Sequence, residues 1–246
     1  MIYDSLLQKG FPSFTSLNSG QMKKETSAIR TQTPRTRFQE HSTPFYLTSS
    51  FVFEDTAQMH ATFTGELERN AYSRYSSPNV QELIDKVCIM EEAESGLAAA
   101  SGMAAIFATL AGLLQSGDHV LASSALFGST YKFLENILRK WGITHDYVPP
   151  TDVKSWENLI RPETKLIYLE TPSNPMLEIV DLEAVKTLAK ANDCLLIVDN
   201  CFATPYLQQP IQFGADIVIH SSTKFMDGQG RVLGGLIAGR QDLINE

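Results

Sequence analysis

The stretch DIVIHSSTKFMDGQGRVLGG, residues 216–235, joins a short apolar run to a glycine-rich loop. The run DIVIH is apolar at successive positions, which predicts a strand buried on both faces of a parallel sheet. Lys224 follows the end of this strand and comes directly after Ser221, Ser222 and Thr223. Because ligands bind beyond the carboxyl ends of strands in open parallel sheets, the amine occupies a position where a ligand site is expected.

The same kind of apolar run recurs along the chain and alternates with amphipathic segments. The runs expected to be strands are 119–123, 143–148, 165–170, 194–199 and 216–220. The segments expected to be helices are 77–93, 101–114, 131–141, 155–160 and 181–193. Strands that alternate with helices predict βαβ units, and therefore an α/β fold with a mainly parallel sheet flanked by helices.

The two ends of the chain have a different character. Residues 1–60 lack a sustained period and are rich in Thr, Ser, Gln and Arg, which predicts an extended N-terminal arm lying across a partner subunit. Residues 61–246 are expected to form one large ligand-binding domain. Its last segment, 232–246, has the pattern of a strand followed by a first helical turn, so a further C-terminal domain is expected to be missing from the sequence.

Composition excludes several classes of partner. A formal net charge of −8 and a pI near 5.2 disfavour nucleic acid and anionic membranes. No apolar run reaches the length of a bilayer span and no secretory signal is evident, so a cytoplasmic protein is expected. Three cysteines without CxxC spacing fit a reducing compartment, with Cys194 as a core residue, and five scattered histidines predict no metal site.

Two polar residues at strand ends have a functional and a structural interpretation. A lone lysine after a strand is usually solvated, but Lys224 among hydroxyls and glycines also fits a Schiff-base lysine. Asp199 ends the run LLIVD and is either a turn residue or a buried carboxylate that keeps a positive partner protonated.

Two further features would suit a phosphate group. The segment SGMAAIFATLAGLL begins a helix at Ser101, so the amides of Gly102 and Met103 form either an anion site or an ordinary capped helix start. In YSRY, residues 72–75, Arg74 is either a surface residue or a phosphate clamp.

Together these residues match the requirements of a pyridoxal phosphate (PLP) enzyme. A dinucleotide-binding GxGxxG loop fits less well, since Gly228 and Gly230 are followed by Leu233 where a third glycine is needed.

At this point the sequence resembles the Cys/Met-metabolism (trans-sulfuration) family of fold-type I PLP-dependent enzymes. The matching motifs, in family order, are YSRYSSPNV, SGMAAI, ETPSNPMLEIVD, VDNCFATP and HSSTKFMDG. The resemblance implies an aspartate aminotransferase-like fold with PLP as cofactor, and a homo-oligomer, at least a dimer and usually a tetramer, with shared active sites. It also implies an amino-acid substrate.

The resemblance implies a role for each matching residue. Lys224 would bind the cofactor covalently and move protons, and Asp199 would bind the pyridine nitrogen. Asn174 would contact the phenolic oxygen of the ring. The residues implied for the phosphate of the same subunit's cofactor are Gly102, Met103, Ser221 and Thr223. Tyr72 and Arg74 would reach the phosphate of the neighbouring subunit's cofactor.

Two residues depart from the family pattern. Phe127 stands where many relatives have a tyrosine over the ring, so stacking is retained without the hydroxyl. Cys201 stands where many have threonine, either as a tolerated small residue or as a group that tunes the ring.

The loop FMDGQGRVLGG is similar to that of the O-succinylhomoserine sulfhydrylase branch, which implies that sulfide replaces the γ-acyl group of an O-acylated homoserine to give homocysteine in methionine biosynthesis. Cystathionine γ-synthase and γ-lyase activities remain alternatives within the family. A non-catalytic binding or assembly protein that has kept the fold is the alternative of another class.

Overall fold

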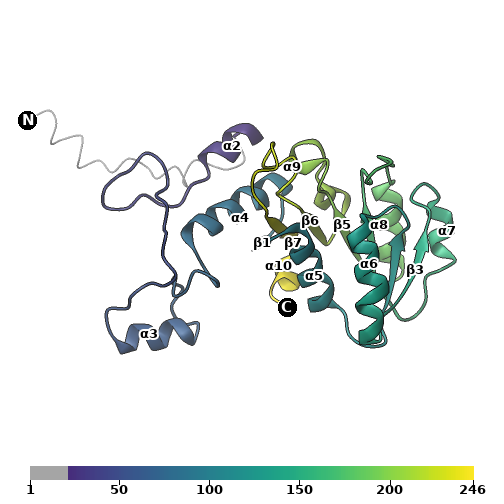
Figure 1. The fold of residues 1–246 in the computed structure, drawn as a ribbon, viewed down its shortest axis with the longest axis horizontal. Coiled ribbons are helices and arrows are strands. Elements are labelled where there is room, and N and C mark those ends of the chain that lie inside the picture. Colours follow the sequence, from purple (N-terminus) through teal and green to yellow (C-terminus); the bar gives the residue numbers. More distant parts are fainter. Residues whose placement is uncertain (1–21) are drawn as a thin grey trace, which may run out of the picture.

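The computed structural model describes residues 22–246 as an α/β fold built on one seven-stranded sheet (Figure 1). The strand order is β1-β7-β6-β5-β4-β2-β3. The five strands from β6 to β3 run parallel to one another, and β7 alone lies antiparallel, between β1 and β6. The predicted α/β class and the mainly parallel sheet are therefore confirmed.

The expected strands form close to their predicted limits, and one further strand precedes them. The strands are β1 (Ser95–Ala99), β2 (His119–Ser123), β3 (Thr144–Val148), β4 (Thr164–Glu170), β5 (Leu195–Asp199), β6 (Ile217–His220) and β7 (Gly235–Gly239). Of these, β1 was not predicted. The last predicted segment divides into β7 and a short helix, as its pattern indicates.

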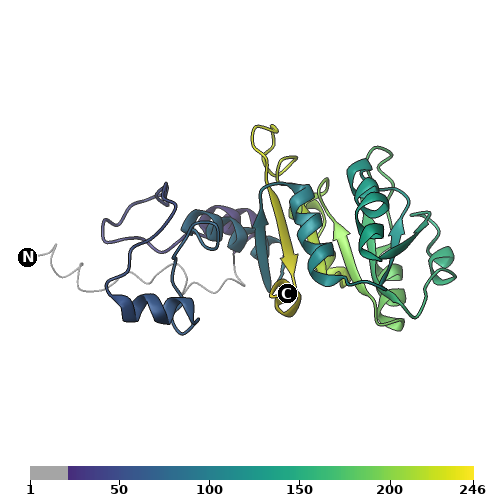
Figure 2. The ribbon, with the colours of Figure 1, turned by 60° about the horizontal axis from the view of Figure 1, so that its bottom comes forward.

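Helices cover both faces of the sheet, as the two views show (Figures 1 and 2). The longer ones are α4 (Pro78–Glu91), α5 (Gly102–Leu113), α6 (Gly128–Asn136) and α8 (Leu182–Ala191). The shorter ones are α2 (Lys24–Arg30), α3 (Thr56–Phe63), η3 (Leu138–Trp141), α7 (Val153–Glu157), α9 (Thr204–Leu207), η4 (Pro210–Phe213) and α10 (Gln241–Ile244). None of the helices in residues 22–246 is long and apolar enough to cross a membrane.

Alternate residues of the central strands supply two separate hydrophobic cores. In β4, Leu166 and Tyr168 face α5 and α6, whereas Ile167 and Leu169 face α7 and α8. All four side chains are fully buried. A strand that buries both faces needs apolar residues at every position, which explains the continuous apolar runs in the sequence.

Helix α4 is buried along only part of its apolar stripe. Ile84 and Val87 pack against β7, while Val80 and Leu83 remain 41% and 43% exposed. Ser77 occupies the N-cap position, but its side chain makes no capping hydrogen bond. The N-terminal end of α4 lies next to the N-terminal arm (Figure 1).

The described part of the predicted arm extends away from the sheet and contains two short helices, α2 and α3 (Figures 1 and 2). Asp55 begins α3 by accepting a hydrogen bond from the Gln58 amide at 2.7 Å, a local signal that the expectation of an extended arm did not use. Thr33 and Thr43 tie the arm to Glu82 of α4. Residues 1–21 of the predicted arm lie outside the described residues.

Candidate active site

The carboxyl ends of β4, β5 and β6 bring the central polar residues to one edge of the sheet. Glu170 ends β4 and is the register partner of Asp199, which ends β5. Asp199 is in turn paired with Ile219, two residues before Ser221. Parallel pairing in register therefore places Glu170, Asp199 and the loop that carries Lys224 side by side.

Asp199 is a buried carboxylate that accepts a hydrogen bond from a backbone amide. It is 7% exposed, and its Oδ1 accepts a hydrogen bond from the Cys201 amide at 3.1 Å. Burial raises the pKa of Asp199 from 3.8 to about 6, against the opposing effects of the Cys201 amide and the nearby His220. A buried carboxylate of this kind is stabilised by a positive partner, which is what a protonated ring nitrogen would supply.

The N-terminus of α5 lies directly against the residues after β6. A Cβ atom added to Gly102 would come within 2.6 Å of the Ser221 Cβ, so only glycine allows this approach. Ser101 caps the helix through the Ala104 amide at 3.1 Å. The amides of Gly102 and Met103 precede Ala105, whose amide is the first to donate within the helix, an arrangement that suits a phosphate.

The lysine loop is held by its own hydrogen bonds. The Thr223 hydroxyl accepts a hydrogen bond from the Gly234 amide at 3.0 Å and donates one to the Gly234 carbonyl at 3.4 Å, so the donor that a phosphate would need is already engaged. The Lys224 amide donates to the Ser221 carbonyl at 3.1 Å. The Lys224 side chain is exposed in the single chain. A nucleophilic amine must be partly shielded from water, and for Lys224 that shielding would have to come from surfaces outside this single chain.

Phe127 and Asn174, predicted to contact the ring, are joined by a residue that the sequence analysis missed. The Glu170 carboxylate accepts a hydrogen bond from the Phe127 amide at 2.7 Å and another from the Asn174 amide at 3.1 Å. Burial, and then the charge of Asp199, raise the pKa of Glu170 to about 7. Glu170 ends an apolar run just as Asp199 does, so the same sequence signal could have identified it.

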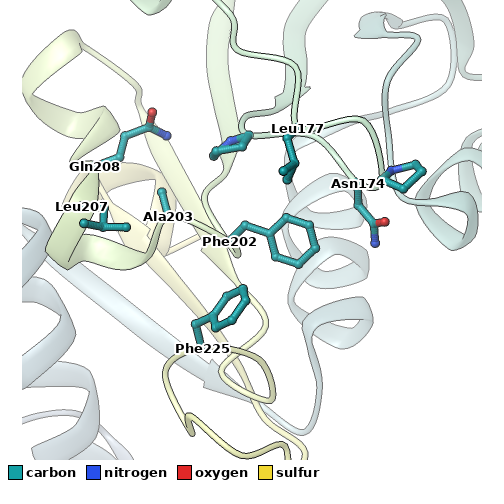
Figure 3. Close-up of a pocket in the computed structure, with 9 residues that line it drawn as sticks. Asn174, Leu177, Phe202, Ala203, Leu207, Gln208 and Phe225 are labelled. Atoms are coloured by element: carbon teal, nitrogen blue, oxygen red, sulfur yellow. The ribbon is translucent and has the colours of Figure 1, made fainter.

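A mostly apolar cavity of about 590 Å³ opens beside this edge (Figure 3). Asn174 and Leu177 line one side of it, and Phe202 and Phe225 line the other, with ring centroids 5.8 Å apart. Phe225 directly follows Lys224. The cavity therefore adjoins the candidate site without containing the lysine.

Tyr72 and Arg74 are not brought to the site within one chain. Arg74 stacks against Tyr72 and Tyr75, with its guanidinium carbon 5.2 and 5.1 Å from the ring centroids. The cluster precedes the N-terminus of α4, whereas Glu91, at the other end of that helix, contacts His220 beside the site. A 14-residue helix is about 20 Å long. The predicted clamp thus lies far from Lys224 of its own chain.

A buried hydrogen-bonded pair of side chains beneath the site was also missed. Glu91 and His220 are fully buried, and Glu91 Oε1 lies 2.6 Å from His220 Nε2. The same oxygen accepts a hydrogen bond from the Asn200 side chain at 3.0 Å. His220 precedes Ser221 and Asn200 follows Asp199, so the pair supports both halves of the site.

Cys201 lies next to Asp199, with its Sγ 3.6 Å from the Ser221 carbonyl oxygen. Burial and the Asp199 charge raise the pKa of the thiol to about 11, which keeps it neutral at physiological pH. Cys194 is a buried core residue, as predicted. Among residues 22–246 there is no group of three or more His, Cys, Asp or Glu side chains that could hold a metal ion.

The raised pKa values of Asp199 and Glu170 predict a pH dependence of stability in the cofactor-free protein. Between about pH 4 and pH 7 the folded state binds more protons than the unfolded state, because the two pKa values rise from 3.8 and 4.5 to about 6 and about 7 on folding. These groups therefore contribute stability below that window. This stability, on the order of 3 kcal/mol per group, is lost as the pH rises through the window.

The measurement is urea unfolding at pH 5 and pH 8 of the wild type and the D199N/E170Q double variant. The double variant should lose less stability than the wild type between the two pH values. Equal pH dependence of the two proteins would contradict the assignment of raised pKa values.

A parallel sheet whose carboxyl edge combines an amine, a buried carboxylate and a glycine-lined helix start defines a PLP-dependent enzyme of fold-type I. Residues 25–246 match the family described as Cys/Met metabolism PLP-dependent enzyme. The chain belongs to this family, whose cofactor is pyridoxal phosphate.

Similar proteins carry more than one activity. The O-succinylhomoserine sulfhydrylase of Pseudomonas aeruginosa is 46% identical over 222 residues, which cover 90% of this chain and 55% of that protein. An L-methionine gamma-lyase of Fusobacterium nucleatum is 39% identical over 230 residues, covering 92% of this chain and 58% of that protein. The chain thus spans little more than half the length of the curated relatives it matches.

Solved structures agree with the fold. A candidate O-acetylhomoserine (thiol)-lyase from Campylobacter jejuni superposes with a TM-score of 0.86 at 36% identity, covering 90% of this chain and 55% of that one. Its structure carries an N′-pyridoxyl-lysine-5′-monophosphate residue. The metB protein of Corynebacterium glutamicum gives a TM-score of 0.87 at 32% identity, covering 93% of this chain and 58% of that one.

Proposed function

We propose that this chain belongs to an enzyme that replaces the γ-acyloxy group of an O-acylated homoserine, preferably O-succinylhomoserine, with sulfide. The products would be homocysteine and the free carboxylic acid, a reaction of methionine biosynthesis in the cytoplasm. The observation that supports the cofactor chemistry is the meeting of Asp199, the Gly102–Ser221 contact and the Lys224 loop at one sheet edge. The 46% identity to an O-succinylhomoserine sulfhydrylase supports the particular reaction.

The residues present fit pyridoxal phosphate, which when bound supplies an electron sink for a carbanion at the substrate Cα. Asp199, which is buried and accepts a hydrogen bond from the Cys201 amide, would hold the protonated ring nitrogen. The start of α5 and Ser221 would hold the phosphate. Phe127 would stack on the ring and Asn174 would contact its phenolic oxygen.

Lys224 would act as the catalytic base and acid. Its amine would hold the cofactor before substrate binds and then move protons between the substrate's Cα and Cβ positions. Because Phe127 has no hydroxyl, it contributes no proton transfer, and Lys224 would carry these steps alone.

A second copy of the chain would complete each site. Tyr72 and Arg74 lie on the arm side of α4, far from Lys224 of their own chain, and would bind the phosphate in the partner. Tyr75, Val80 and Leu83 are exposed beside them and would be buried on association. A homodimer that pairs into a tetramer is the proposed assembly.

Elimination is the second candidate function. The similarity to an L-methionine gamma-lyase supports a reaction in which no thiol is added and a 2-oxo acid and ammonia leave. Cystathionine formation, with cysteine in place of sulfide, uses the same residues.

The deciding experiment supplies the PLP-loaded full-length protein with O-succinylhomoserine, sulfide and cysteine together and identifies the products by mass. Homocysteine as the main product is expected. Cystathionine or a 2-oxo acid as the main product would overturn the sulfhydrylase proposal while leaving the cofactor site as argued.

A further inference from the structure

Glu170 is a buried acid whose two carboxylate oxygens serve two different loops. Oε2 accepts the Phe127 amide at 2.7 Å and Oε1 accepts the Asn174 amide at 3.1 Å. The residue is 5% exposed. Phe127 lies at the start of α6, after β2, and Asn174 lies in the loop after β4. One side chain therefore fixes the separation of two segments that are far apart in the sequence.

Resting on the proposed function, we propose that Glu170 is a positioning residue that holds Phe127 and Asn174 at the spacing the cofactor ring requires. It would touch neither substrate nor cofactor and would act through the two backbone amides. The register pairing of Glu170 with Asp199 places this link directly beside the carboxylate that faces the ring nitrogen. The residues that end β4 and β5 would thus position all three side chains proposed to contact the ring, those of Phe127, Asn174 and Asp199.

The chemistry of the link explains why an acid is needed. A carboxylate offers two acceptor oxygens and no donor, so it can receive both amides at once. A glutamine offers one acceptor and turns an NH₂ donor toward the second amide, which leaves that amide unpaired. An aspartate keeps both oxygens and the charge but is one methylene shorter, by about 1.5 Å, and reaches only one loop.

The test compares E170Q and E170D with the wild type, and uses E163Q as the matched control. Glu163 is an exposed glutamate just before the same strand. Amide hydrogen exchange in the cofactor-free protein reports on the link itself, independently of any reaction. Titration with pyridoxal phosphate and the ellipticity of the bound cofactor's absorption band report on the ring's surroundings.

In both E170Q and E170D, exchange in at least one of the two peptides, the one with Phe127 or the one with Asn174, should accelerate at least about 10-fold. The dissociation constant for pyridoxal phosphate should rise about 10-fold, and the ellipticity of its band should fall. The E163Q variant should match the wild type in all three measurements.

Three results would overturn the proposal: unchanged exchange in E170Q, wild-type cofactor binding in E170Q, or full recovery in E170D, which would show that charge alone matters. If E170Q does not fold, E170D still tests the link. A different reaction product, or no product at all, would contradict the proposed function and leave the exchange result valid.

Discussion

Replacing Lys224 with alanine should lower turnover of the full-length, PLP-loaded protein by at least about 10⁴-fold. The reason is that, under the proposed function, one amine would both hold the cofactor and move the substrate protons. General acid–base transfer alone is worth about 10²–10⁴-fold, and loss of a covalent catalyst costs more. The cofactor would still bind, since its phosphate and ring contacts would be made by other residues.

Turnover and borohydride reduction followed by intact-protein mass measurement test this expectation. The wild type should gain the mass of a pyridoxyl phosphate group, and K224A should not. The control is K190A, which removes an exposed lysine in the last turn of α8. Turnover of K224A within 10-fold of K190A would rule out Lys224 as the catalytic amine.

Replacing Glu91 with alanine should lower the free energy of unfolding by about 3–5 kcal/mol. The substitution leaves His220 and the Asn200 side chain buried without the carboxylate oxygen that both contact. Leaving a buried hydrogen-bond donor without an acceptor costs about 1–3 kcal/mol, and here two donors lose the same acceptor. Surface substitutions on the same helix should change stability by no more than about 0.5 kcal/mol.

Urea unfolding of E91A is compared with that of D85A, which removes an exposed acid of the same helix. The double variant E91A/H220A should be less destabilised than the sum of its single variants, with a coupling of about 0.5–3 kcal/mol. If E91A proves no less stable than D85A, the buried pair does not support the site as described.

The parts of the fold that sequence predicted well are those decided by local pattern. β2 forms at its predicted residues, and β4, β5 and β6 differ from prediction by one residue at most at either end. Such strands bury both faces, so their apolar runs stand out from the flanking helices. Asp199 and Lys224 were found because each ends or follows one of these runs.

The parts that sequence missed depend on distant partners. The segment SGLAA becomes β1 only because β7 lies beside it, and nothing in its own composition favours a strand. Glu91 reads as a solvated acid near a helix end, but its partners are 109 and 129 residues away. The spacing of Phe127 and Asn174 follows from Glu170, which serves both loops at once.

The antiparallel strand β7 also sets an order of events during protein synthesis. β1 stands at the edge of the described sheet and pairs with β7, and Gly235 follows Ser95 by 140 residues. A ribosome adds about 5–20 residues per second, so the nascent β1 waits on the order of ten seconds for its neighbour to be made. During that interval the apolar face of α4 that later packs on β7 is exposed to solvent. Exposed apolar surface of this kind is what chaperones bind during synthesis.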